Sequence, residues 1–158
     1  MRVMTFLVGL AIWLMTAVTP VTAQTVQNNG GLEFGKIAAG AGGASVTISP
    51  TGTRTAIGAI LISGGTTQAA TFTVTGTPLA GYEVTFGTPT PLAGPNSSGM
   101  ELSGFTTSLP LVNDVYQGTL DGDGTASFQV GATIAVGATQ TPGPYVNGSI
   151  PVTVNYSP

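Results

Sequence analysis

The sequence predicts an all-β protein, an antiparallel β-sandwich, from three observations. Thr, Val and Gly are abundant, and β-branched residues favour strands while Gly and the 11 prolines mark turns. Apolar and polar residues alternate along several short segments, as in strands with one face toward a core. These segments recur about every ten residues, a spacing that favours a sandwich or barrel over alternating strands and helices.

The chain begins with a segment typical of a secretory signal peptide. The first two residues supply a positive charge, residues 3–18 are apolar except for two threonines, and small residues precede Gln24. The apolar run is shorter than the ~20 residues that a membrane helix needs. We therefore expect cleavage after Ala23 (signal peptide, residues 1–23) and export to the periplasm, the cell surface or the medium.

The expected mature chain divides into a short polar leader, residues 24–31, and a single domain, residues 32–158. A domain of this length can bury about two-thirds of the surface of its unfolded chain. The sequence contains no cysteine. Packing and strand pairing, and not disulfides, must therefore stabilise the fold.

Five strands are predicted before residue 88. They lie at residues 31–37, 44–49, 54–62, 69–75 and 81–87. The second ends at a Pro-Thr-Gly turn, and the third ends in an apolar run that meets two glycines. The core-facing residues of the last two are Phe72 and Val74, then Tyr82, Val84 and Phe86.

A loop rich in Pro, Gly and Ser, residues 88–99, precedes the remaining strands. These are predicted at residues 100–106, 115–120, 124–136 and 145–156. Gly131 interrupts the alternation of the third, which predicts a bend or bulge there.

The terminal strand carries Ile150, Val152, Val154 and Tyr156 on one face and polar residues on the other. We expect it to pair within its own sandwich with these four side chains in the core. Pro151 lacks the backbone N–H of a ladder, which indicates an outward-facing edge. Another chain can add to such an edge, so the same four residues are candidates for assembly.

Composition argues against catalysis. The sequence has no histidine and no cysteine, which removes Ser-His-Asp triads, Cys-His dyads and the usual zinc ligands. Paired carboxylates remain possible, but Glu33, Glu83 and Glu101 occupy polar positions of predicted strands and are expected on solvated faces. Lys36 and Arg54 are likewise expected at the surface. No enzyme activity, catalytic residue or cofactor is expected.

One acidic motif has two interpretations. Asp121 and Asp123, separated and followed by glycine, form a weak candidate calcium site. The motif lacks the third ligand and distant glutamate of an EF-hand loop. Asp-Gly is also a strong hairpin signal, and a hairpin turn is the favoured interpretation.

Charge limits the partners. The expected mature chain keeps Lys36 and Arg54 against all six acidic residues. Two separated cations cannot neutralise a nucleic-acid backbone or dock on an anionic membrane. Surfaces with so few charges tend to associate, which favours self-association.

Five stretches in fixed order resemble the DUF4402 family, a bacterial secreted family of unknown function: "LEFGKIAAG", "VTISPTGTRTA", "AATFTVTGTP", "ASFQVGATIAVGATQTPGPY" and "GSIPVTVNY". The chain is more loosely similar to spore-coat-U and fimbrial-subunit domains, which have an element like Phe34-Gly35 and a near-final tyrosine like Tyr156. That similarity implies an immunoglobulin-like or pilin-like sandwich. The chain differs in lacking a disulfide, and its leader has one apolar residue, Val26, where a donated strand needs several.

Two functions follow. The first is a non-catalytic secreted bacterial surface protein, structural or adhesive or fimbria-like, that self-associates or binds other envelope proteins. The alternative is a soluble binding module for glycans or another surface protein, using loops 88–99 and 109–116. Four tyrosines are the candidates for stacking on sugars: Tyr82, Tyr116, Tyr145 and Tyr156.

Overall fold

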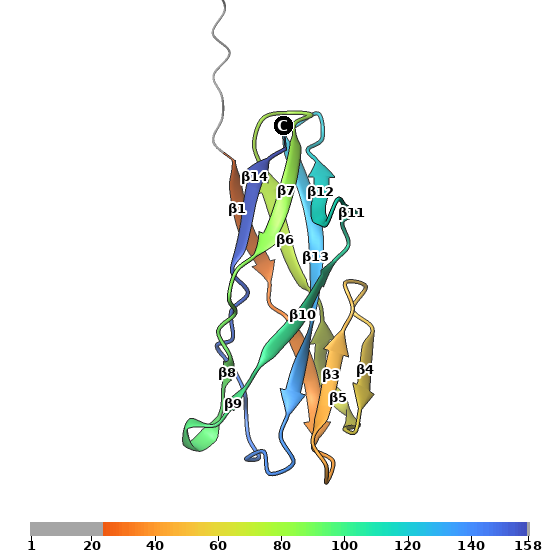
Figure 1. The fold of residues 1–158 in the computed structure, drawn as a ribbon, viewed down its shortest axis with the longest axis vertical. Coiled ribbons are helices and arrows are strands. Elements are labelled where there is room, and N and C mark those ends of the chain that lie inside the picture. Colours follow the sequence, from red (N-terminus) through yellow and green to blue (C-terminus); the bar gives the residue numbers. More distant parts are fainter. Residues whose placement is uncertain (1–23, 158) are drawn as a thin grey trace, which may run out of the picture.

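The computed structural model describes residues 24–157, and these residues form an elongated, two-layered β-structure (Figure 1). The expected signal peptide lies outside the described residues. All ladders between the described strands are antiparallel. Among residues 24–157, the one helical element is a short 3-10 turn, η1 (Pro95–Ser97). The predicted fold class, an antiparallel β-sandwich, is confirmed.

The larger sheet runs the length of the molecule. Its strand order is β1-β6-β13-β3-β4, with β10 on the other edge of β13. The strands are β1 (Thr25–Gly30), β3 (Ala44–Ile48), β4 (Arg54–Ile57), β6 (Ala70–Thr75), β10 (Leu102–Thr107) and β13 (Thr125–Val136). The long β13 joins the two halves, because it pairs with β6 up to Val130 and with β3 from Ala132.

The second layer is divided. In the half drawn uppermost in Figure 1, the upper half, it is a four-stranded sheet of order β11-β12-β7-β14. Its strands are β7 (Gly81–Phe86), β11 (Leu111–Val112), β12 (Val115–Thr119) and β14 (Val152–Tyr156). The lower half has two small sheets instead: β2 (Glu33–Ala38) with β5 (Ile60–Gln68), and β8 (Leu92–Ala93) with β9 (Gly99–Met100).

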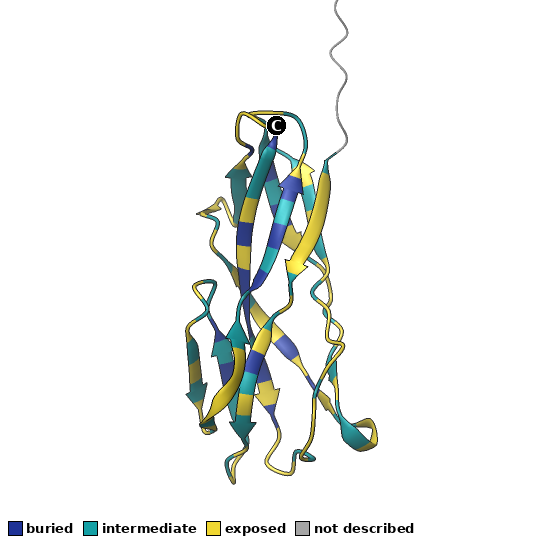
Figure 2. Cartoon of the chain, turned by 180° about the vertical axis from the view of Figure 1, so that it is seen from behind, coloured by how far each residue is buried: buried dark blue, intermediate teal, exposed yellow. Residues whose placement is uncertain are grey.

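The core follows the same division. The upper cluster includes Phe72, Tyr82 and Phe128, and the lower cluster includes Phe34 and Ile134. Leu32 and Phe105 pack against both clusters and connect them. Buried residues alternate with residues of intermediate exposure along β6 and β7 (Figure 2), as the period-two pattern predicts.

The predicted strand at residues 54–62 is wrong in its extent. The chain turns at Gly58, whose φ of 75° lies in the left-handed region, and this separates β4 from β5. The strand β5 then continues through Gly64 and Gly65, both at φ 85°, where the sequence predicts an end. Glycine therefore marks a turn at residue 58 but lies within a strand at residues 64 and 65.

Gly131 does not interrupt β13. A Cβ atom at this position would lie 2.2 Å from the backbone oxygen of Ile48. The glycine is therefore required because β3 approaches closely where β13 changes partner from β6 to β3. The predicted irregularity is also present in the pairing, because the register of the β10–β13 ladder shifts between the pairs Thr106–Gly131 and Ser103–Thr133 while β13 itself stays continuous.

The polar leader forms a strand that its sequence does not predict. β1 pairs with β6 and is almost fully exposed. Side chains add to the ladder, since the hydroxyls of Thr25 and Thr75 hydrogen-bond at 2.5 Å and Asn29 donates to Thr73. An outer strand that buries neither face has no reason to alternate apolar and polar residues.

Candidate functional site

A large concave feature, a hollow of 1240 Å³, lies in the lower half. Two runs of consecutive residues form its walls, residues 31–39, which contain β2, and residues 140–150. In this half the second layer consists of the two small sheets β2-β5 and β8-β9 and has no four-stranded sheet. We call this feature the edge hollow.

The two walls differ in their backbone: residues 31–39 contain the strand β2, whereas residues 140–150 form an irregular segment with a bend at residues 142–143 and Asn147 at φ 61°. β2 pairs with β5, whereas residues 140–150 form two bridges to the segment before and within β8, Val146 with Ala93 and Ser149 with Thr90. Within residues 24–157, no ladder or backbone hydrogen bond joins the two walls to each other. The hollow therefore separates two parts of the chain that are held independently, one by β5 and the other by residues 90–93.

The floor of the edge hollow is apolar. It includes Phe34, Phe72, Leu102 and Ile134, each less than 9 % exposed. The lining also includes the polar side chains of Asn28, Gln140 and Asn147 and the ring of Tyr145. The charged lining residues are Glu33 and Lys36, both exposed on β2. The edge hollow therefore combines an apolar floor with polar groups.

Arg54 is not a simple surface charge. Its guanidinium donates hydrogen bonds from Nη1 to the carbonyl oxygens of Phe34 at 2.8 Å and Lys36 at 3.2 Å, and from Nη2 to that of Ile62 at 3.2 Å. The side chain crosses from β4 over Gly35, where a Cβ atom would lie 2.6 Å from Nη1. Arg54 thus fastens β2 and β5, and with them one wall of the edge hollow, to the larger sheet.

The terminal strand lies where the sequence predicts, but it is shorter. β14 pairs with β7, and Ile150, Val152, Val154 and Tyr156 are half-buried against the upper core cluster. Residues 145–150, which the sequence places in this strand, belong instead to the irregular wall segment of the edge hollow. β14 is the last strand of its sheet, so it is an edge strand, as the position of Pro151 indicates.

The acidic motif forms a turn between β12 and β13, but the hairpin interpretation is wrong, because these two strands are not paired and the turn passes from the four-stranded sheet to the larger sheet. Asp121 Oδ1 accepts hydrogen bonds from the N–H groups of Asp123 at 3.0 Å and Thr125 at 2.8 Å, and Oδ2 accepts one from the Thr125 hydroxyl at 2.9 Å. The hydrogen bonds from Thr125 are the main reason that the pKa of Asp121 is lowered. Among the described residues, no group of three or more Asp, Glu, His or Cys side chains could hold a metal ion.

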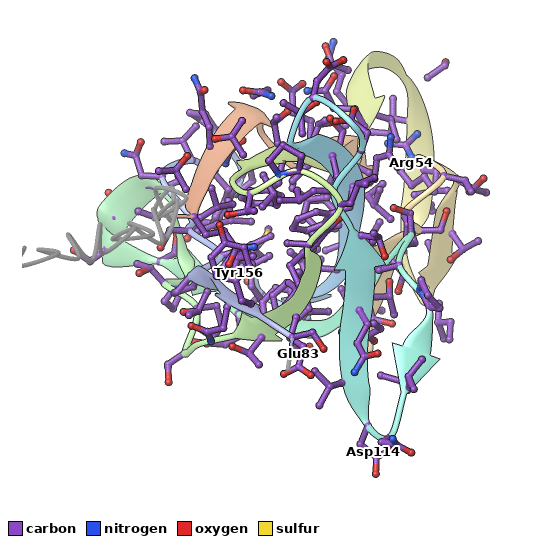
Figure 3. The ribbon with its side chains drawn as sticks, turned by 90° about the horizontal axis from the view of Figure 1, so that it is seen from above. Arg54, Glu83, Asp114 and Tyr156 are labelled. Atoms are coloured by element: carbon purple, nitrogen blue, oxygen red, sulfur yellow. The ribbon has the colours of Figure 1, made fainter. Side chains whose placement is uncertain are left out.

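The remaining ionisable groups are dispersed. Figure 3 shows Arg54, Glu83 and Asp114 at separate positions around the molecule. Glu83 accepts a hydrogen bond from Gln117 at 3.2 Å, and burial raises the pKa of Tyr82. These side chains do not converge on one site that could carry general acid–base chemistry.

The loops suggested for glycan binding lie apart. In Figure 1, η1 is at the lower left and β11 at the upper right, so loops 88–99 and 109–116 do not form one surface. Two of the suggested tyrosines fasten loops: Tyr145 donates from its hydroxyl to Thr141 O at 2.7 Å, and Tyr156 accepts from the Thr77 N–H at 2.9 Å. The edge hollow was not predicted, because its walls are about 100 residues apart in sequence.

The fold and this hollow define a small all-β sandwich protein with open strand edges. The family model for the domain of unknown function DUF4402 matches residues 24–156, and the chain belongs to this family. No curated protein and no solved structure matches the chain. Within residues 24–157, no helix is long and apolar enough to cross a membrane.

Proposed function

We propose that this chain is a non-catalytic, exported bacterial surface protein with a structural or adhesive role, whose copies associate through exposed strand edges. The predicted signal peptide, residues 1–23, supports export. Several ionisable side chains have a role in the fold, which supports a structural protein: Asp121 holds a turn and Arg54 holds a sheet.

The observation that carries the proposal is an aliphatic patch on β4 and β5. Ile57, Ile60 and Ile62 are 79, 67 and 42 % exposed. β4 is the outermost strand of the larger sheet beside β3. Lys36 pairs with Ile62, and Arg54 bonds to the Ile62 carbonyl. An exposed apolar edge strand is the feature through which sheets of separate molecules associate. We call these three residues the isoleucine patch.

Sedimentation velocity of the mature chain, residues 24–158, tests this proposal. The mature protein should form concentration-dependent assemblies, and a variant with Ile57→Thr and Ile60→Thr should remain monomeric. Leu111→Thr is the matched control, because Leu111 is 57 % exposed on β11 and lies outside the patch. A mature protein that stays monomeric at high concentration, or a double variant that assembles normally, would contradict the proposal.

A further inference from the structure

We infer that the isoleucine patch of one copy binds the turn between β6 and β7 of the next copy, so that the chain assembles head to tail. This turn, residues 77–80, carries Leu79, and we call it the leucine turn. The inference rests on the proposed function, because it assumes that copies associate through the isoleucine patch. It adds which surface of the second copy occupies that patch.

Leu79 is an unusual residue for its backbone conformation. Its φ of 61° lies in the left-handed region, which Gly or Asn adopts readily and a residue with a large side chain adopts at a cost. The Leu79 N–H donates to the carbonyl oxygen of Asp121 at 3.0 Å, which holds the turn in place. The Leu79 side chain is 72 % exposed, so the described chain does not bury it. A strained, exposed leucine on a fixed turn favours contact with another molecule.

The leucine turn lies in the acidic half of the molecule. The upper half contains four of the six acidic residues and neither cation of the expected mature chain; these acids are Glu83, Asp114, Asp121 and Asp123. Asp121 and Asp123 are both exposed, and they belong to the turn that accepts the hydrogen bond from Leu79. The leucine turn is therefore an exposed apolar side chain next to an acidic turn.

The isoleucine patch lies beside both cations of the expected mature chain. Lys36 pairs with Ile62 in the ladder between β2 and β5. Arg54 is on β4 with Ile57, and its three hydrogen bonds all go to neutral carbonyl oxygens. These bonds do not neutralise the guanidinium, so a carboxylate of a second copy can complement its charge.

The patch and the leucine turn are complementary to each other but not to themselves. Contact between two patches would bring together two cations from each copy, and contact between two leucine turns would bring together two carboxylates from each copy. Contact between a patch and a turn instead packs Leu79 against isoleucine side chains and brings opposite charges together. Charge and apolar surface therefore both identify a second copy of this chain as the partner.

The two surfaces lie in opposite halves of the elongated molecule. In Figure 1 the segments that join β6 to β7 and β12 to β13 form the upper end, whereas β4 and β5 lie in the lower half. Contact between two different surfaces leaves one patch and one turn free on every dimer. Further copies can add to both, so the assembly grows beyond a dimer.

Two complementary variants test the inference by sedimentation velocity on the mature chain. The patch variant carries Ile57→Thr and Ile60→Thr. The turn variant carries Leu79→Asn and Asp123→Asn; asparagine adopts the left-handed region readily, and the Asp123 side chain is exposed. Loss of the leucine contact should weaken assembly at least about tenfold. Each variant should therefore be monomeric when it is alone.

An equal mixture of the two variants should form a dimer that contains one copy of each. The patch variant keeps an intact turn and the turn variant keeps an intact patch, so one contact forms and no further copy can add. The matched control carries the same two changes elsewhere, Leu111→Asn on β11 and Asp114→Asn in the turn after it, and should assemble as the unchanged chain does. Leu79→Gly, which adopts the same φ without strain, should behave as the turn variant does.

Two results would overturn the inference and leave the proposed function intact: a turn variant that assembles like the unchanged chain, or a mixture of the two variants that stays monomeric. Either result would show that a different surface meets the isoleucine patch. A mature chain that is itself monomeric would contradict the proposed function, and the inference with it. Failure of assembly and failure of the head-to-tail contact therefore give different results.

Discussion

Replacing Arg54 with methionine removes three hydrogen bonds that fasten β2 and β5 to β4. The acceptor that matters most is the carbonyl of Phe34, since Phe34 is buried and its bond is the shortest of the three, 2.8 Å. A buried acceptor that loses its donor costs about 1–3 kcal/mol. The carbonyls of Lys36 and Ile62 belong to exposed residues and can turn to water. We expect a loss of about 2 kcal/mol in the free energy of unfolding.

Urea denaturation followed by circular dichroism measures this loss. The slope of the unfolding free energy against urea concentration should stay unchanged if only stability is affected. Lys36→Met is the matched control. It removes the same charge from an exposed side chain of β2 and should change stability by less than about 0.5 kcal/mol. If Arg54→Met were no more destabilising than Lys36→Met, the three hydrogen bonds would not fasten the wall of the edge hollow.

Three further predictions concern the sandwich itself. Val152→Asp places a carboxylate against the upper core and should cost about 2 kcal/mol or more in thermal or urea unfolding, whereas Thr153→Asp on the exposed face should cost far less. Gly131→Ala should cost over ~3 kcal/mol because its Cβ atom would overlap a backbone oxygen of β3, while Gly42→Ala, with open space, should be neutral. Asp121 has a lowered pKa when folded, so its carboxylate stabilises the fold above the pKa of the unfolded state. That contribution should disappear as pH falls through the folded-state pKa, and the stability advantage over Asp121→Asn should shrink with it.

The sequence predicts the upper half of the fold well because its strands bury one face. Tyr82 and Val84 in β7 and Phe128 and Val130 in β13 alternate with polar residues, and the structure buries all four. Alternation carries this information only where one face is packed and the other solvated. The polar strand β1 gave no signal for that reason.

Glycine and arginine were harder to interpret from sequence. Gly58 ends a strand whereas Gly64 lies inside one, although all that the sequence shows is a glycine in an apolar context. Arg54 is a charged residue of the kind usually found at the surface. Its role depends on three carbonyl groups that only the tertiary fold brings together. The edge hollow depends in the same way on two distant segments, so local pattern could not reveal it.

The most direct test of the proposed function is the mass and location of the native protein in the producing cell. Intact-protein mass spectrometry of the cytoplasmic, periplasmic, outer-surface and medium fractions measures both together. The proposal predicts a chain that begins at Gln24 and is recovered from the outer-surface fraction. A chain that retains residues 1–23 and is recovered from the cytoplasm would contradict it.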